Sequence, residues 1–180
     1  MIYTIGHSTR NWEDFVRVLK AYGIKIIVDV RHFPSSKKFP WFCKEHMEKA
    51  LENEGIKYIW LKELGGYRKE GYANYMKSKE FEKGIEKLIK IAEKEKTAIL
   101  CAELIWWRCH RRYIADVLVK KGIEVVHIWD ESKSEKHKWQ KLIKGLVLPS
   151  KIKDKIGNIK INRFFHNNNT EIISLNISLF

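Results

Sequence analysis

The sequence predicts an α/β fold, a three-layer sandwich in which a mostly parallel five-stranded sheet carries helices on both faces. Two observations lead to this prediction. Five short apolar runs recur along the first 130 residues, and a segment with apolar residues at helical spacing follows each of them. Strands that alternate with helices indicate parallel pairing through right-handed crossovers. The length of 180 residues is sufficient for one domain with a full core.

The predicted strands are the apolar runs 2–5, 25–30, 56–61, 97–102 and 123–129. Asn11 is a typical helix N-cap, with Asp14 three residues later, and Gly23 ends the first helix. The remaining helices are expected over 42–54, 81–92, 109–121 and 133–144, and a glycine-containing loop with one helical turn is expected over 62–74.

The organisation predicted along the chain is one α/β domain over residues 1–149 and a C-terminal tail over 150–180. The tail is rich in Asn, Lys and Ile, and it contains the run "NNN". It is expected to be either disordered or an added edge strand, and the residues do not decide between the two.

Charge and composition restrict the class of protein. Lys and Arg outnumber Asp and Glu by 35 to 22, so the formal net charge is +13. Such a surplus favours anionic partners, although many of the lysines alternate with glutamate as in a solvated helix face. No apolar run is long enough to span a bilayer, and no signal peptide is recognisable. Three cysteines without a leader predict reduced thiols in a cytoplasmic protein with no membrane partner.

Chemistry-bearing residues follow the ends of the predicted strands. In an open parallel sheet these ends share one edge, which is where ligands bind. Four of these residues are the catalytic candidates Asp29, Glu103, His7 and Cys101. The anion-binding candidates are Arg31, Arg108, Cys109, His110, Arg111, Ser8 and Ser36, and the loop candidates are Gly65 and Gly66.

The basic cluster 108–112 lies where a helix is expected to begin. A helix N-terminus favours anions, so clustered cations there suggest an anionic ligand that completes the site. Alternatively the cations pair with acids in a structural network, the available acids being Asp29, Glu63, Glu103 and Asp130.

Cys101 allows two interpretations. A cysteine at a strand end, before a loop and a helix, suits a thiolate nucleophile, but six residues separate it from Arg108 and the loop holds Trp106 and Trp107 instead of glycine. A buried small apolar residue is the alternative. Cys101, Cys109 and His110 also suggest a metal, yet they lack the paired spacing of zinc sites. From the sequence we therefore assign no metal and no cofactor.

Five motifs together resemble a known family. They are "TIGHSTR", "DVRHFPSS", "LKELGGY", "YMKSKEFEKGI" and "ILCAELIWWRCHRRYIAD". In order and spacing they are similar, over about residues 1–130, to the domain-of-unknown-function family 488. The resemblance implies an α/β fold and no particular reaction. It places motif positions on Gly6, His7, Ser8, Asp29, Arg31, Pro34, Ser36, Leu64, Gly65, Gly66, Cys101, Glu103, Cys109, His110 and Arg111. One departure is "LIWW", where family members often have a proline.

The function expected from these residues is the binding of a phosphate-bearing or nucleotide-type anion at the sheet edge. Arg31, Arg108 and Arg111 would bind the anion, and His7 and His110 would donate hydrogen bonds. Asp29 or Glu103 would act as acid or base or would orient the arginines. The alternatives are a non-catalytic nucleic-acid-binding module, favoured by the charge of +13, and an anion sensor that signals to a partner. Whether the protein is an enzyme, and its oligomeric state, remain open at this stage.

Overall fold

The computed structural model describes residues 1–138 in full and the backbone of residues 161–166 and 170–175. The chain divides into two compact units, over 1–140 and 141–180. In the second unit, β7 (Ile161–His166) and β8 (Thr170–Leu175) pair as an antiparallel two-stranded sheet. The remainder of the predicted tail lies outside the described residues.

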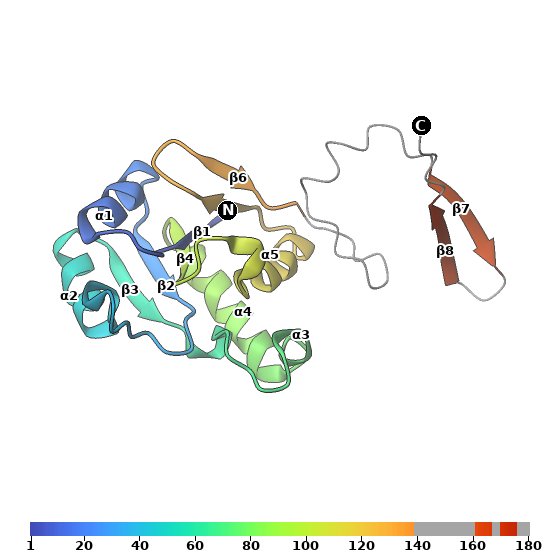
Figure 1. Cartoon of the computed structure of the whole chain (residues 1–180), viewed down its shortest axis with the longest axis horizontal. Coiled ribbons are helices and arrows are strands. Elements are labelled where there is room, and N and C mark those ends of the chain that lie inside the picture. Colours follow the sequence, from blue (N-terminus) through green and yellow to red (C-terminus); the bar gives the residue numbers. More distant parts are fainter. Residues whose placement is uncertain (139–160, 167–169, 176–180) are drawn as a thin grey trace. The chain divides into compact units, whose positions relative to one another are not determined.

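The first unit is the predicted α/β sandwich around a mostly parallel sheet (Figure 1). The sheet order is β3-β2-β4-β1-β5-β6, and all neighbours are parallel except β5 and β6. The strands are β1 (Ile2–Gly6), β2 (Ile26–Asp29), β3 (Lys57–Trp60), β4 (Thr97–Cys101), β5 (Val125–Ile128) and β6 (Ser134–Lys136). The α-helices are α1 (Trp12–Ala21), α2 (Lys44–Asn53), α3 (Tyr72–Tyr75), α4 (Lys79–Ala92) and α5 (Arg111–Lys120), and the 3₁₀ turns are η1 (Pro40–Phe42), η2 (Lys62–Leu64) and η3 (Trp106–Arg108).

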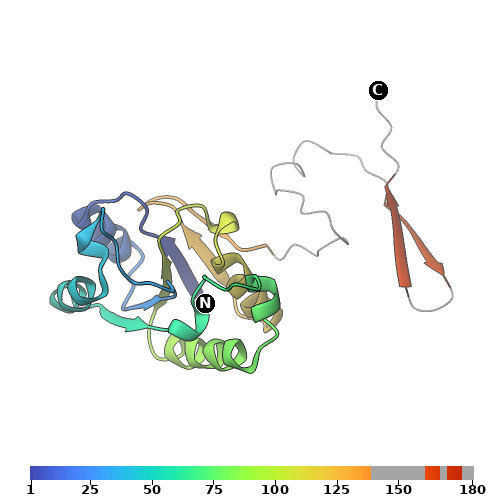
Figure 2. The same ribbon diagram turned by 60° about the horizontal axis from the view of Figure 1, so that its bottom comes forward.

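The two faces of the sheet carry different helices (Figure 2). Side chains of α1 and α2 such as Phe15 and Met47 pack on one face, against Ile27 and Leu100. Helices α3, α4 and α5 pack on the other face, on the alternate strand residues. Helix α1 begins with the expected capping chemistry, because the Asn11 side chain accepts a hydrogen bond from the backbone N–H of Asp14. No helix in the described part of the chain has the length and apolar character needed to cross a membrane.

The sheet has six strands, one more than predicted, and the difference lies at 133–144. There the sequence predicts a helix, whereas residues 134–136 form β6, antiparallel to β5. Asp130 accepts hydrogen bonds from the backbone of Ser132 and Lys133, and this turn reverses the chain directly after β5. The three polar or charged residues of β6 are exposed, so the segment carried no apolar strand pattern. Residues 139–144 lie outside the described residues.

Candidate functional site

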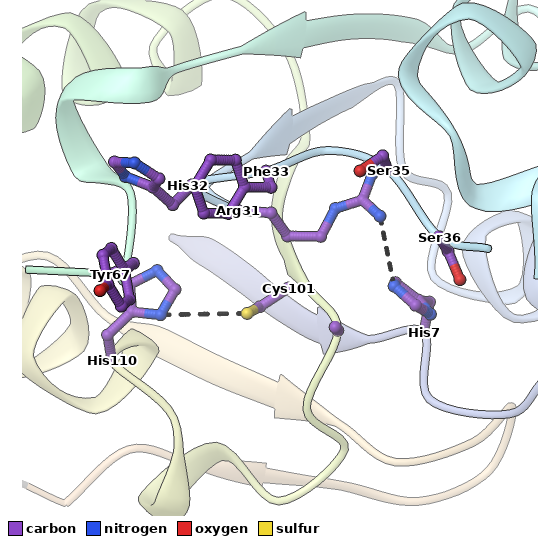
Figure 3. Close-up of a pocket in the computed structure, with 11 residues that line it drawn as sticks. His7, Arg31, His32, Phe33, Ser35, Ser36, Tyr67, Cys101 and His110 are labelled. Carbon is purple, nitrogen blue, oxygen red and sulfur yellow. Dashed lines mark hydrogen bonds between the residues drawn. The ribbon is translucent and has the colours of Figure 1, made fainter. Parts of the chain in front are cut away.

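A cavity of about 290 Å³ lies where β1, β2 and β4 end, at the predicted edge of the sheet (Figure 3). The residues that line it are His7, Arg31, His32, Phe33, Ser35, Ser36, Gly66, Tyr67, Cys101, Ala102 and His110. A second hollow of about 560 Å³ lies beside β3 and α4 and contains none of the predicted site residues. The first cavity is therefore the candidate site.

Asp29 and Arg31 form a buried ion pair behind the cavity. Arg31 Nε lies 2.9 Å from both carboxylate oxygens and Nη2 lies 2.5 Å from Oδ2. The Tyr58 hydroxyl donates to the same Oδ2 at 2.7 Å, and burial together with the Asp29 charge raises the pKa of Tyr58. Asp29 thus holds the Arg31 guanidinium by its Nε and Nη2 edge. Nη1 is left for His7, 3.3 Å away, and for the cavity.

His7 is held in one tautomer. Since a guanidinium can only donate, Nε2 of His7 accepts from Arg31, and Nδ1 donates to the Ser8 carbonyl at 3.0 Å. Its ring stacks on Phe42 with centroids 4.2 Å apart. The pKa of His7 is lowered to about 4, chiefly by burial and secondly by the nearby charge of Arg31. His7 is therefore neutral at pH 7, with its lone pair committed to Arg31.

Cys101, Cys109 and His110 form a second group at the cavity. His110 Nδ1 lies 3.9 Å from the Cys101 sulfur and 3.5 Å from the Cys109 sulfur. A hydrogen bond from the Cys101 thiol lowers the pKa of Cys109, while that bond and burial raise the pKa of Cys101. Gly66 makes room for this arrangement, because a Cβ there would lie 2.4 Å from His110 Nδ1. All three cysteines of the chain carry free thiols.

Arg111 is buried, with 1% of its surface exposed, and it is not among the residues that line the cavity. Its guanidinium donates to the carbonyls of Glu103 and Leu104, to the Thr4 hydroxyl at 3.4 Å and to the Cys109 sulfur at 3.5 Å. These bonds tie the β4–α5 loop to β1. Within the described residues, no carboxylate pairs with Arg111. One arginine of the basic cluster 108–112 therefore has a structural role inside the fold.

The structure brings some predicted residues to the cavity and leaves others apart. His7, Arg31, Ser36, Gly66, Cys101 and His110 line it. Arg108 is exposed on η3, and the Glu103 carboxylate accepts from the Ile105 backbone outside the cavity. Ser8 adopts a positive φ of 50° and donates its N–H to Ala102. Gly65 allows close packing of its loop on His32. Of the acids proposed for a structural network, Asp29 pairs with Arg31 and Glu63 with Lys87, whereas Asp130 accepts from its own turn.

Four residues at or beside the cavity were not among the candidates from the sequence, namely Phe33, Tyr58, Tyr67 and Arg68. Tyr58 holds Asp29, and His32 lines the cavity beside the exposed rings of Phe33 and Tyr67. Arg68 also lies there, because its Nη1 is 3.2 Å from His32 Nδ1 and its buried Nε has no hydrogen-bond partner. The signal available in the sequence was the position of Arg68 two residues after Gly65–Gly66, in a loop already expected at the edge.

A hydrogen-bonded chain beside Arg111 predicts acid sensitivity. The Thr4 hydroxyl donates to His127 Nδ1 at 2.7 Å, and His127 Nε2 donates to His137 Nδ1 at 2.9 Å. His137 Nε2 in turn donates to Asp116 at 2.9 Å. In this chain each imidazole donates once and accepts once, as a neutral imidazole does. The pKa of His127 is lowered to about 2, chiefly by burial and secondly by the neighbouring His137. The unfolded state binds a proton below about pH 6.5 while the folded state does not. As the pH falls from about 6.5 to 4, we therefore expect the free energy of unfolding to fall by about 1.4 kcal/mol per pH unit because of His127.

Urea unfolding between pH 7.5 and 4.5 checks this expectation. His127→Gln should flatten the dependence of the unfolding free energy on pH, whatever its effect at pH 7.5. His46→Gln, which alters an exposed histidine on α2, is the matched control for replacing a histidine by glutamine. An identical slope in wild type and His127→Gln would contradict the neutral chain.

Comparison with known proteins identifies one family. The model of the family described as "Domain of unknown function DUF488" matches residues 11–118, which include α1 to α4 and most of α5. The searches of curated proteins and of solved structures found no match. The match spans Asp29, Arg31, Cys101, Cys109 and His110.

Proposed function

The chain belongs to the DUF488 family of domains of unknown function, and we propose that its cavity binds a small ligand with a phosphate or similar anionic group attached to a flat ring. The family description assigns no reaction, so the proposal rests on the cavity. The observation that carries it is the lining. Arg31, His32 and two serines can offer hydrogen bonds to a ligand, whereas the ring nitrogens of His7 and His110 already have partners within the protein. None of the lining residues in the described part of the chain is an Asp or Glu.

Two arginines supply the positive character. The Arg31–Asp29 pair is neutral as a whole, but it presents Arg31 Nη1 in a fixed orientation, which suits recognition of an oxyanion. Arg68 adds a charge that no carboxylate neutralises among the described residues, and it contacts the lining through His32. Its guanidinium also lies over the Tyr75 ring, 3.7 Å from the centroid, which holds the charge beside the lining.

The aromatic rings at the cavity support a ligand with a flat ring. Phe33 and Tyr67 are 65% and 62% exposed, which is unusual for large side chains that line a cavity. Their centroids lie 6.2 Å apart, and each ring contacts His32. Exposed aromatic faces of this kind stack on nucleobases and similar rings. Trp106 and Trp107 do not line the cavity, since Trp106 stacks on His127 and Trp107 contacts Trp106 and Trp129.

The groups that could act on such a ligand are Cys101 and His110, because both line the cavity. Asp29 is bonded to Arg31 behind the cavity, which supports a role in orienting Arg31. Glu103 lies outside the cavity, so an acid–base role for it gains no support from its position. We therefore propose ligand binding, and Cys101 and His110 as the residues that would take part if the protein also acts on the ligand.

A nucleic-acid-binding module is the second candidate, and the net charge of +13 favours it. It predicts that affinity follows overall charge and falls steeply with salt, because phosphate neutralisation releases counterions. A ligand held in the cavity instead depends on particular arginines. Two substitutions that remove equal charge therefore separate the candidates.

We expect a nucleoside monophosphate at about 100 times its dissociation constant to stabilise the protein by about 2.7 kcal/mol, and inorganic phosphate to need higher concentrations. Arg68→Met should abolish this stabilisation. Arg108→Met removes the same charge from an exposed position and should retain it. Thermal unfolding at matched ionic strength provides the measurement. Equal effects of the two variants, or stabilisation by a short oligonucleotide alone, would contradict the proposal and favour the second candidate.

A further inference from the structure

Three potential metal ligands converge at one wall of the cavity. The Cys101 and Cys109 sulfurs and His110 Nδ1 all lie within 4.8 Å of one another. The cysteines are buried, and Cys101 and His110 also line the cavity. Figure 3 shows the Cys101 sulfur directed at the His110 ring. The cluster therefore combines a protected interior with one accessible side.

The sulfur–nitrogen distances match tetrahedral coordination. Zinc binds cysteine sulfur at about 2.3 Å and histidine nitrogen at about 2.0–2.1 Å, so a tetrahedral angle separates the two ligand atoms by about 3.6 Å. The observed sulfur–nitrogen distances are 3.5 Å for Cys109 and 3.9 Å for Cys101. A cation would thus fit with only a small movement of side chains.

The His110 ring is oriented as a ligand. Its Nε2 lies 2.9 Å from the Val30 carbonyl, which can only accept, so Nε2 carries the proton. The lone pair is then on Nδ1, which faces both sulfurs. Metal-bound histidines usually donate their second N–H to a carbonyl or carboxylate in this way. Gly66 lies against the ring, and its lack of a side chain leaves room for the ring in this orientation.

The surrounding charge favours anionic sulfur. Arg111 Nε lies 3.5 Å from the Cys109 sulfur, and this buried guanidinium has no carboxylate partner in the described part of the chain. A thiolate supplies the missing negative charge. Two thiolates and an imidazole suit a borderline-soft cation such as Zn²⁺, whereas Mg²⁺ and Ca²⁺ prefer oxygen ligands.

We propose that Cys101, Cys109 and His110 bind one zinc-type divalent cation, with its fourth coordination position open to the cavity. Three protein ligands and one open position are typical of reactive rather than purely structural zinc sites. This inference goes beyond the ligand proposal and does not depend on it, because metal binding requires only the three side chains. An anion in the cavity would be able to reach the open position.

Cobalt titration of the reduced, chelator-stripped full chain tests the site. Wild type should take up about one Co²⁺ per chain with thiolate-to-cobalt charge-transfer absorption, and Zn²⁺ should remove the absorption. Cys101→Ser and Cys109→Ser should lose it. Cys43→Ser is the matched control, because Cys43 lies outside the cluster and bonds to Ser36. Absence of the absorption in wild type, or an equal loss in Cys43→Ser, would overturn the proposal.

Alkylation of wild type provides a test that does not depend on folding of the variants. Zn²⁺ should slow the modification of Cys101 and Cys109 by iodoacetamide and leave Cys43 unaffected, as measured by peptide mass spectrometry. Equal protection of all three cysteines, or a Cys101–Cys109 disulfide that persists under reducing conditions, would overturn the site; the disulfide would identify a redox pair instead. Nucleotide binding by the metal-free protein separates this outcome from that of the ligand proposal.

Discussion

Asp29→Ala should destabilise the protein by about 3–5 kcal/mol, because it leaves Arg31 charged and buried without its counterion. The two side chains are 0% and 5% exposed, so the guanidinium left without its carboxylate gains little solvation. The Tyr58 hydroxyl loses its acceptor in the same change. Urea unfolding at pH 7 measures the effect. We also expect weaker ligand binding, since Arg31 would lose its orientation at the cavity.

A surface pair of the same residue types provides the control. Asp14 and Arg17 form an exposed ion pair on α1, and Asp14→Ala should cost no more than about 1 kcal/mol. A double variant, Asp29→Leu with Arg31→Met, should recover part of the stability lost in Asp29→Ala, because it leaves no unpaired charge. A loss below about 1 kcal/mol in Asp29→Ala would show that the pair does not act as a buried unit.

Arg111→Met should cost about 3 kcal/mol or more. The substitution keeps an unbranched apolar chain but removes the donors that satisfy the carbonyls of Glu103 and Leu104. Each buried acceptor left without a partner costs about 1–3 kcal/mol. The loop between β4 and α5 would then lose its attachment to β1, so His110 and Cys109 should become more mobile.

Arg108→Met is the matched control for this change. It lies three residues earlier, removes the same charge, and is exposed, so we expect a change within about 0.5 kcal/mol. Thermal or urea unfolding compares the two variants directly. Similar small losses in both would contradict the role assigned to Arg111 and restore it as a candidate for binding an anion at the surface.

The parallel sheet and its helices were predictable because their signals are local. Asn11 caps α1 as expected, and Gly23 follows that helix with a positive φ of 62°. The convergence of His7, Arg31 and Cys101 followed from topology alone, since parallel strands end at one edge. β6 was missed because its three exposed charged and polar residues have no apolar pattern, and its turn depends on Asp130.

The roles of the basic residues could not be predicted from the sequence. Arg108 and Arg111 are three residues apart, yet one is exposed and the other is buried on carbonyls. Burial of a charge depends on which loop closes over it, and here that loop passes against Gly6, where a Cβ would meet the Glu103 carbonyl at 2.1 Å. Such long-range packing leaves no periodic signal, and the same holds for Arg68.

The central claim is that the cavity at the ends of β1, β2 and β4 binds an anionic ligand with a ring. Amide chemical shifts of labelled protein, followed while a nucleoside monophosphate is added, test it most directly. We predict saturable shifts at the lining residues, above all His32, Ser35, Gly66, Tyr67 and Ala102. Shifts confined to the lysine-rich exposed face of α4, or spread evenly over the basic surface, would contradict the claim.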